Sequence, residues 1–119
     1  PPLLVSPTPS MNVTPLPRTG MPLGVLEEAV WGRGVARLAC GDLLLLCTDG
    51  VTEAQNIQGQ FYADERLQQM SCLAQRAQSD AVPVSAQGIL NYLLQDIHAF
   101  IGPAPRADDL TMVVLRREN

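Results

Sequence analysis

The sequence contains no lysine, and all eight of its basic residues are arginine. This absence excludes a P-loop, which needs a lysine for its phosphates, and excludes enzymes that form a Schiff base through a lysine. The net charge of −4 also argues against nucleic-acid binding, which needs a basic face. No apolar run approaches the roughly 18 residues of a membrane span. We therefore expect a cytoplasmic protein with no membrane insertion in this segment.

Cysteine is scarce, and its spacing excludes a structural zinc site. Cys40, Cys47 and Cys72 form no C-x-x-C pair. Their apolar surroundings predict reduced, buried thiols, as is usual in the cytosol.

Length and composition predict one small domain. The chain has 119 residues, of which 46% are apolar, enough for a core. It begins with Pro-Pro and has no initiator methionine, so we expect a piece of a longer protein.

Five segments have the patterns of β-strands. "PPLLV" and "MNVTPL" predict a strand pair joined by a turn at "SPTPS", and Pro15 places the second strand on an edge because it cannot donate a ladder hydrogen bond. Residues 35–40 alternate in polarity, and Gly41-Asp42 is a hairpin turn signal. "LLLLCT" is apolar on both faces, which predicts a central strand covered on both sides. "LTMVVLRR" predicts a closing strand.

Two consecutive helices are predicted between residues 64 and 102. The first has apolar residues at spacings of three and four, with Asp64 as its N-cap; these residues are Leu67, Met70, Leu73, Ala74 and Ala77. The second is capped by Ser85 and ends at Gly102. Hairpins exclude a purely parallel wind, so the predicted fold class is α+β with an antiparallel sheet.

Two acidic motifs flank the strands that we expect to be neighbours. Asp49-Gly50 follows "LLLLCT", and Asp108-Asp109 precedes "LTMVVL". If the two strands are antiparallel, both motifs meet at one rim of the sheet. Carboxylate oxygens suit magnesium or manganese. Asp-Gly is also common in turns and Asp-Asp in loops, so the spacing alone leaves both interpretations open.

The ordered motifs "GDLLLLCTDGVTEAQN", "GQFYADERL" and "ADDLTMVVLRR", with "GMPLGV" before them, closely resemble the metal-dependent protein serine/threonine phosphatases of the PPM family. The resemblance is to the bacterial SpoIIE-like branch and covers about residues 1 to 117. It implies a two-metal centre between two antiparallel sheets, using Mn²⁺ or Mg²⁺ to activate a hydroxide for attack on phosphorus. It assigns Asp49 and Asp108 as metal ligands, with Asp109 as the alternative, and Gly50 as a close backbone approach to the site. It assigns no catalytic side chain.

The same resemblance implies that part of the domain lies elsewhere. The family's bridging Asp and a second Asp-Gly motif have no counterpart here, so residues 1–119 are expected to be a single partial domain, the C-terminal half of the phosphatase β-sandwich. The family commonly has Gly after the Phe of "GQF", where this chain has Tyr62. Members often act in signal transduction and stress response on regulators of sigma factors.

Two functions follow. The first is part of a phosphatase for phosphoserine or phosphothreonine on a regulatory protein, such as an anti-anti-sigma factor, inactive as this isolated segment. The alternative is a non-catalytic phosphatase-like module that binds a partner protein in signalling. Half a sandwich exposes apolar surface, so we also expect a homodimer or packing against another chain.

Overall fold

The structure is a computed structural model that describes residues 1–7, 10–79, 84–106 and 108–119. Within these ranges, four strands form one antiparallel sheet and three segments are helical. The strands are β1 (Leu3–Ser6), β2 (Asn12–Pro15), β3 (Leu43–Cys47) and β4 (Met112–Arg116), and the helices are α1 (Asp49–Thr52), α2 (Ala63–Ser79) and α3 (Ala86–Ile101). The predicted α+β class with an antiparallel sheet is confirmed.

The sheet has the strand order β2-β1-β3-β4. β1 pairs with both β2 and β3, and β3 pairs with β4, all antiparallel. The prediction of an edge strand containing Pro15 is confirmed, as is the central position of β3. The turn expected at residues 6–10 includes residues 8 and 9, which lie outside the described residues.

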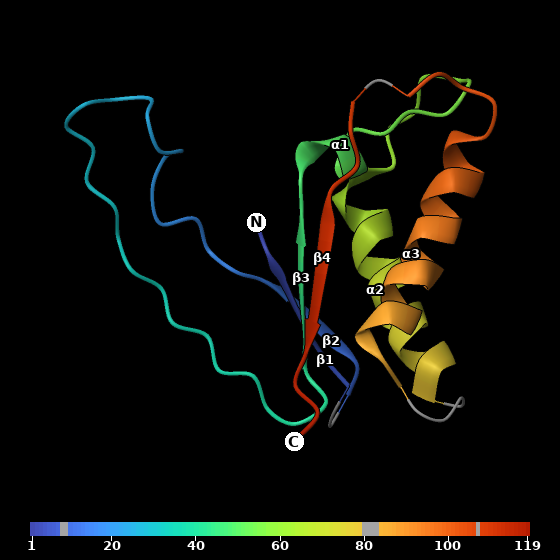
Figure 1. The fold of residues 1–119 in the computed structure, drawn as a ribbon, viewed down its shortest axis with the longest axis horizontal. Coiled ribbons are helices and arrows are strands. Elements are labelled where there is room, and N and C mark those ends of the chain that lie inside the picture. Colours follow the sequence, from blue (N-terminus) through green and yellow to red (C-terminus); the bar gives the residue numbers. More distant parts are fainter. Residues whose placement is uncertain (8–9, 80–83, 107) are drawn as a thin grey trace.

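Helices cover one face of the sheet only (Figure 1). Leu43 and Leu45 of β3 are fully buried beneath α2 and α3, whereas Leu46, on the opposite face, is 38% exposed. The prediction that this strand is covered on both sides is therefore wrong. The second face of β3 is apolar, as the sequence predicts, but no described segment forms a layer over that face.

The open face of the sheet carries a continuous set of apolar residues. The register places Leu4 beside Leu44, Leu44 beside Leu115, and Leu46 beside Val113, and neighbouring side chains in a register share a face. We call this set the open sheet face: Leu4, Leu44, Leu46, Val113 and Leu115.

The hairpin predicted at residues 35–47 is wrong in its first strand. Residues 35–40 form no strand, and Val35 is 85% exposed. The physical reason is that β1 and β4 occupy both edges of β3, so residues 35–40 have no edge to join. A turn is nevertheless present before β3. The Asp42 amide donates to the Ala39 carbonyl at 3.0 Å, and the Ala39 amide donates to the Asp42 carboxylate at 2.8 Å.

Residues 17–38 leave the sheet as a long irregular segment, which we call the arm. It extends on the side of the sheet opposite to the helices (Figure 1). The Trp31 indole N–H donates to the Met21 carbonyl and the Gly32 amide to the Thr19 carbonyl, both at 2.7 Å. The outgoing and returning limbs of the arm are therefore joined to each other.

The helices follow their predicted boundaries closely. Ser85 caps α3 by accepting a hydrogen bond from the Gly88 amide at 3.0 Å, and Gly102 ends it with φ of 56°. Ile89, Leu93 and Ile97 are fully buried. These outcomes confirm the predicted caps and apolar stripe of the second helix.

The first long helix departs from prediction in two respects. α2 begins at Ala63, so Asp64 lies in its first turn and is not its N-cap. Leu67 and Ala74 are buried as predicted, but Leu73 is 44% exposed and Ser71 is fully buried. Ser71 tolerates this position because its hydroxyl donates to the Leu67 carbonyl at 2.6 Å.

The three cysteines are free, but not all are buried. Cys47 and Cys72 are half-buried, and burial raises the pKa of both thiols. Cys40 is exposed, which contradicts its predicted burial; it lies in the unpaired segment before β3, and its thiol donates to the Glu118 carbonyl at 2.9 Å.

Candidate metal site

The candidate site lies where β3 ends and β4 begins. Beyond the pair Cys47–Met112, the Thr48 amide donates to the Thr111 carbonyl at 3.1 Å, and the Thr111 amide donates to the Thr48 hydroxyl at 3.3 Å. These bonds hold the segment after β3 against the segment before β4. Asp49 and Asp108 consequently occupy the same rim of the sheet, as the antiparallel arrangement requires.

Gly50 is buried against the Asp108–Asp109 main chain. A Cβ atom built on Gly50 would overlap the carbonyl oxygen of Asp109 and lie 3.7 Å from the Cβ of Asp108. Only a residue without a side chain fits this approach unless the neighbouring backbone moves. The Asp-Gly and Asp-Asp motifs, nearly sixty residues apart in the chain, therefore touch through their backbones.

Asp49 and Asp108 line two adjacent cavities. Asp49 lines a cavity of about 370 Å³ with Thr48 and Asp64, whereas Asp108 lines one of about 400 Å³ with Gly50. Glu53 and Phe61 line both cavities. Both aspartates are exposed, and one oxygen of Asp108 accepts a hydrogen bond from the Asp109 amide at 2.8 Å. Asp109 thus contributes backbone to the rim.

This donor set fits part of the coordination of one hard divalent cation. Carboxylate oxygens are suitable ligands, and a magnesium ion commonly takes one or two of them together with water. Among the described residues, no group of three or more His, Cys, Asp or Glu side chains is placed to hold a metal. Two carboxylates are fewer than a two-metal centre needs.

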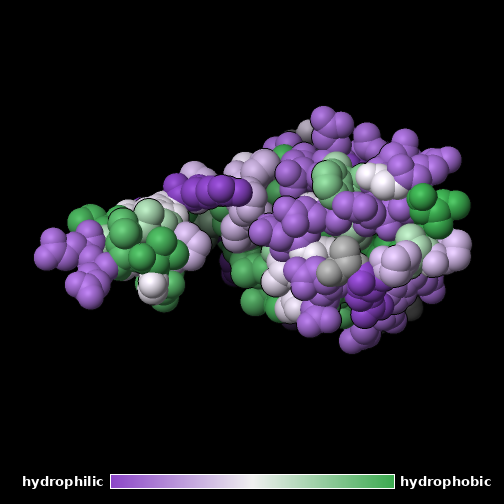
Figure 2. Space-filling model, turned by 90° about the horizontal axis from the view of Figure 1, so that it is seen from above, coloured by the Kyte–Doolittle hydropathy of each residue, from purple (hydrophilic) through white to green (hydrophobic). Residues whose placement is uncertain are grey.

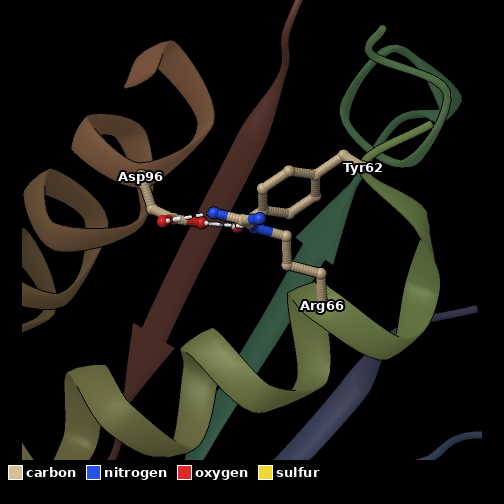
Figure 3. A network of polar contacts seen from close by, with 3 residues as sticks. All are labelled: Tyr62, Arg66 and Asp96. Atoms are coloured by element: carbon tan, nitrogen blue, oxygen red, sulfur yellow. Dashed lines mark hydrogen bonds and ion pairs between the residues drawn. The ribbon is translucent and has the colours of Figure 1, made fainter. Parts of the chain in front are cut away.

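A polar network anchors the loop that follows the site (Figure 3). The Tyr62 hydroxyl donates to Asp96 of α3 at 2.6 Å, and Arg66 of α2 donates two further hydrogen bonds to the same carboxylate at 3.0 and 3.1 Å. The Arg66 guanidinium also lies 4.9 Å from the ring centroid of Phe100, and the Tyr62 and Phe100 rings meet edge to face at 5.4 Å.

The network connects α1 to the helical layer. The Tyr62 amide donates to the Ala54 carbonyl at 2.8 Å, and Phe61 forms a bridge with Gln55, so Tyr62 closes the loop that begins after α1. The hydrogen bonds from Arg66 are the main cause of the lowered pKa of Asp96, and burial is the main cause of the raised pKa of Tyr62. Tyr62, Arg66 and Asp96 hold the loop beside the site in place. They are not among the residues that line either cavity.

No sequence pattern predicts this network directly. The sequence marks Tyr62 only as a departure from the glycine usual after Phe61. The left-handed backbone lies one residue later, at Ala63 with φ of 69°, while Tyr62 is 1% exposed and fills the space between α2 and α3. An acid 34 residues away cannot be paired with Tyr62 from one sequence.

None of the helices in the described ranges is both long and apolar enough to cross a membrane. A one-sided antiparallel sheet, two covering helices and an acidic rim define the class as an α+β domain.

The comparison with protein families matches the model of Stage II sporulation protein E (SpoIIE) over residues 1–118. The chain belongs to this family. No curated protein matches the chain significantly. Among solved structures, the phosphatase domain of the cell fate determinant SpoIIE from Bacillus subtilis, presoaked with Mn, matches with a TM-score of 0.54 and 18% identity. The match covers 99% of this chain and 47% of that structure, so the chain has about half of that fold.

Proposed function

We propose that this chain is part of a protein serine/threonine phosphatase domain that acts on a phosphorylated regulatory protein. The observation that carries the proposal is the contact of Gly50 with the Asp108–Asp109 backbone, which brings two acidic motifs to one rim in a chain of the SpoIIE family. The manganese named for the related Bacillus subtilis structure supports a metal-dependent activity.

In this proposal, Asp49 and Asp108 hold one Mn²⁺ or Mg²⁺ ion, and the complete domain binds two. When bound, such ions supply a nucleophilic hydroxide and neutralise the phosphate oxygens. The chain's own contribution is rigidity. β3 and β4 fix the two acidic segments through the Thr48–Thr111 hydrogen bonds, and Gly50 lets them approach. A fixed geometry lowers the cost of organising the site when ligand binds.

We further propose that residues 1–119 alone are inactive, since two carboxylates do not complete a two-metal centre. The second candidate is a non-catalytic module that binds a partner protein. Its support is the absence of a three-ligand group among the described residues. A phosphorylated regulator such as an anti-anti-sigma factor and a cytoplasmic location remain parts of this proposal.

The test uses the natural polypeptide that contains this chain. We expect Asp49→Asn and Asp108→Asn each to abolish turnover of a phosphoserine peptide and to weaken Mn²⁺ binding, with circular dichroism unchanged. Because the metal centre acts as a unit, the double variant should cost little more than either single one.

Asp109→Asn is the matched control, since it removes a neighbouring carboxylate and keeps the backbone. It should be milder if Asp108 is the ligand. Near-normal turnover of Asp49→Asn at low manganese would refute the assignment. Residues 1–119 alone should give negligible manganese-dependent hydrolysis of p-nitrophenyl phosphate, and clear turnover by them would refute the proposed inactivity.

A further inference from the structure

Within the described part of the chain, three cavities lie side by side at the end of the molecule where α3 ends. The cavities of Asp49 and Asp108 share two lining residues, and the cavity of Asp108 also shares two with a third cavity of about 350 Å³. The segments that follow α1 and α3 come together at this end (Figure 1), and the surface there is largely hydrophilic (Figure 2). A row of adjacent cavities beside the candidate metal site can hold an extended ligand. We call the third cavity the outer cavity, and its lining residues are His98, Ile101, Gly102, Ala104 and Arg106.

Arg106 lies at the boundary between the Asp108 cavity and the outer cavity, because it lines both of them. The backbone that leads to it is restrained. The Ala104 amide donates to the Ile101 carbonyl at 3.1 Å, which continues the turn after α3. Pro105 fixes its own φ immediately before Arg106. The end of α3 therefore presents this arginine beside the candidate metal site.

The Arg106 guanidinium is free to bind a ligand. Within the described residues it makes no hydrogen bond and no ion pair, whereas the Arg66 guanidinium is occupied by Asp96. The outer cavity also contains the imidazole of His98, and no acid is among its described lining residues. A cavity with an unpaired guanidinium, an imidazole and no carboxylate favours an anionic group.

We propose that the outer cavity binds an acidic side chain of the phosphorylated substrate, and that Arg106 is the specificity-determining residue that selects it. This inference rests on the proposed function, because it takes the phosphorylated residue to lie over Asp49 and Asp108. The acidic residue is then a close neighbour of the phosphorylated one in an extended segment, in which successive residues advance by about 3.3 Å. The planar guanidinium donates two parallel N–H hydrogen bonds to the substrate carboxylate.

The charges around Arg106 favour a substrate carboxylate in the outer cavity over a contact with the phosphoryl group. An anion that approaches Arg106 from the Asp108 cavity meets the carboxylates of Glu53 and Asp108, which repel it. An anion that approaches from the outer cavity meets no acid among the described lining residues. Phe61, which is 57% exposed, and Leu110 give the Asp108 cavity an apolar wall against which the aliphatic part of a substrate side chain can pack.

The test measures, by fluorescence anisotropy in the presence of Mn²⁺, how two labelled peptides bind to the natural polypeptide that contains this chain. Both peptides contain the methylene phosphonate analogue of phosphoserine, which is not hydrolysed. The acidic peptide has aspartate at the two positions on each side of the analogue, and the neutral peptide has asparagine there. We expect the acidic peptide to bind on the order of fivefold more tightly, the upper end for an exposed ion pair. Arg106→Gln should bind the two peptides equally, with the affinity of the natural polypeptide for the neutral one.

Arg76→Gln is the matched control, because Arg76 is an exposed arginine of α2 that lines none of the three cavities. It makes the same change in charge and should keep the preference for the acidic peptide. Arg106→Lys should keep a smaller preference, since lysine retains the charge but not the planar fork of donors.

Three results would overturn the proposal: no binding of either peptide, equal binding of both by the natural polypeptide, or an Arg106→Gln variant that weakens both alike. The last result would place Arg106 on the phosphoryl group. Turnover of p-nitrophenyl phosphate, which has no neighbouring residues, tests the proposed function by itself. The proposed function and this inference can therefore fail separately.

Discussion

The removal of one hydroxyl, in Tyr62→Phe, tests whether the network around Asp96 holds the helices together. The Tyr62 ring is buried and its hydroxyl lies 2.6 Å from the carboxylate. A hydrogen bond to a charged group contributes about 1.5–3 kcal/mol. Asp96 keeps its two bonds from Arg66 and is reached by some water, so we take the lower end, about 1.5 kcal/mol. For a chain of this length, this corresponds to a melting temperature about 6 °C lower.

The effect should depend on pH with a definite sign. Asp96 has a lowered pKa in the folded state, so the stability that its charged form contributes is complete above its ordinary value of 3.8. This contribution is lost as the pH falls through the lower folded pKa. The difference between the natural chain and Tyr62→Phe should therefore be full at pH 7 and shrink below about pH 3.8.

The assay is urea unfolding followed by circular dichroism at pH 7 and at pH 3. Tyr92→Phe is the matched control: Tyr92 is a half-buried tyrosine on α3 whose hydroxyl has no hydrogen-bond partner within the described residues. It should change the free energy of unfolding by less than about 0.5 kcal/mol. If Tyr62→Phe is as mild as Tyr92→Phe at pH 7, the network does not stabilise the fold in the way described.

Further substitutions test local features. Ala63→Gly should raise the free energy of unfolding by up to about 1 kcal/mol in urea, because Ala63 has a left-handed backbone; a loss of stability would contradict the strain. Gly50→Ala should lower it by about 2 kcal/mol or more, since the new Cβ meets the Asp109 carbonyl, and an unchanged urea midpoint would show that the contact yields freely. Ser85→Ala should cost about 1 kcal/mol and leave the amides at the start of α3 exchanging faster; slow exchange would exclude a capping role.

The sequence predicted most of what depends on local pattern. The α3 boundaries follow from Ser85, Gly102 and an apolar stripe, and these signals act within a few residues of the element that they define. The edge position of β2 follows from Pro15 alone. The place of the candidate site could also be predicted from local pattern, because Asp49 and Asp108 each lie next to an apolar run that predicts a strand.

The errors have one physical source, which is dependence on distant partners. Asp96 and Tyr62 are 34 residues apart, and no sequence pattern around either residue predicts its contact with the other. Leu46 lies in an apolar run that predicts burial, yet it is 38% exposed because no described residue covers that face of β3. The failure at residues 35–40 is of the same kind, because β-propensity measures fit to neighbours more than a preference of the backbone itself.

These dependencies share one feature, which is a group that lacks a partner among the described residues. Within the described residues, a strand-like segment has no pairing partner, one apolar face of the sheet is uncovered, and no third carboxylate joins Asp49 and Asp108. Each would be unfavourable or incomplete in a self-sufficient domain, because exposed apolar surface and free strand edges promote association. Local pattern and final environment agree in natural sequences. Leu46 and residues 35–40 depart from this agreement, and the same departure explains why the sequence pattern mispredicted the environment of both.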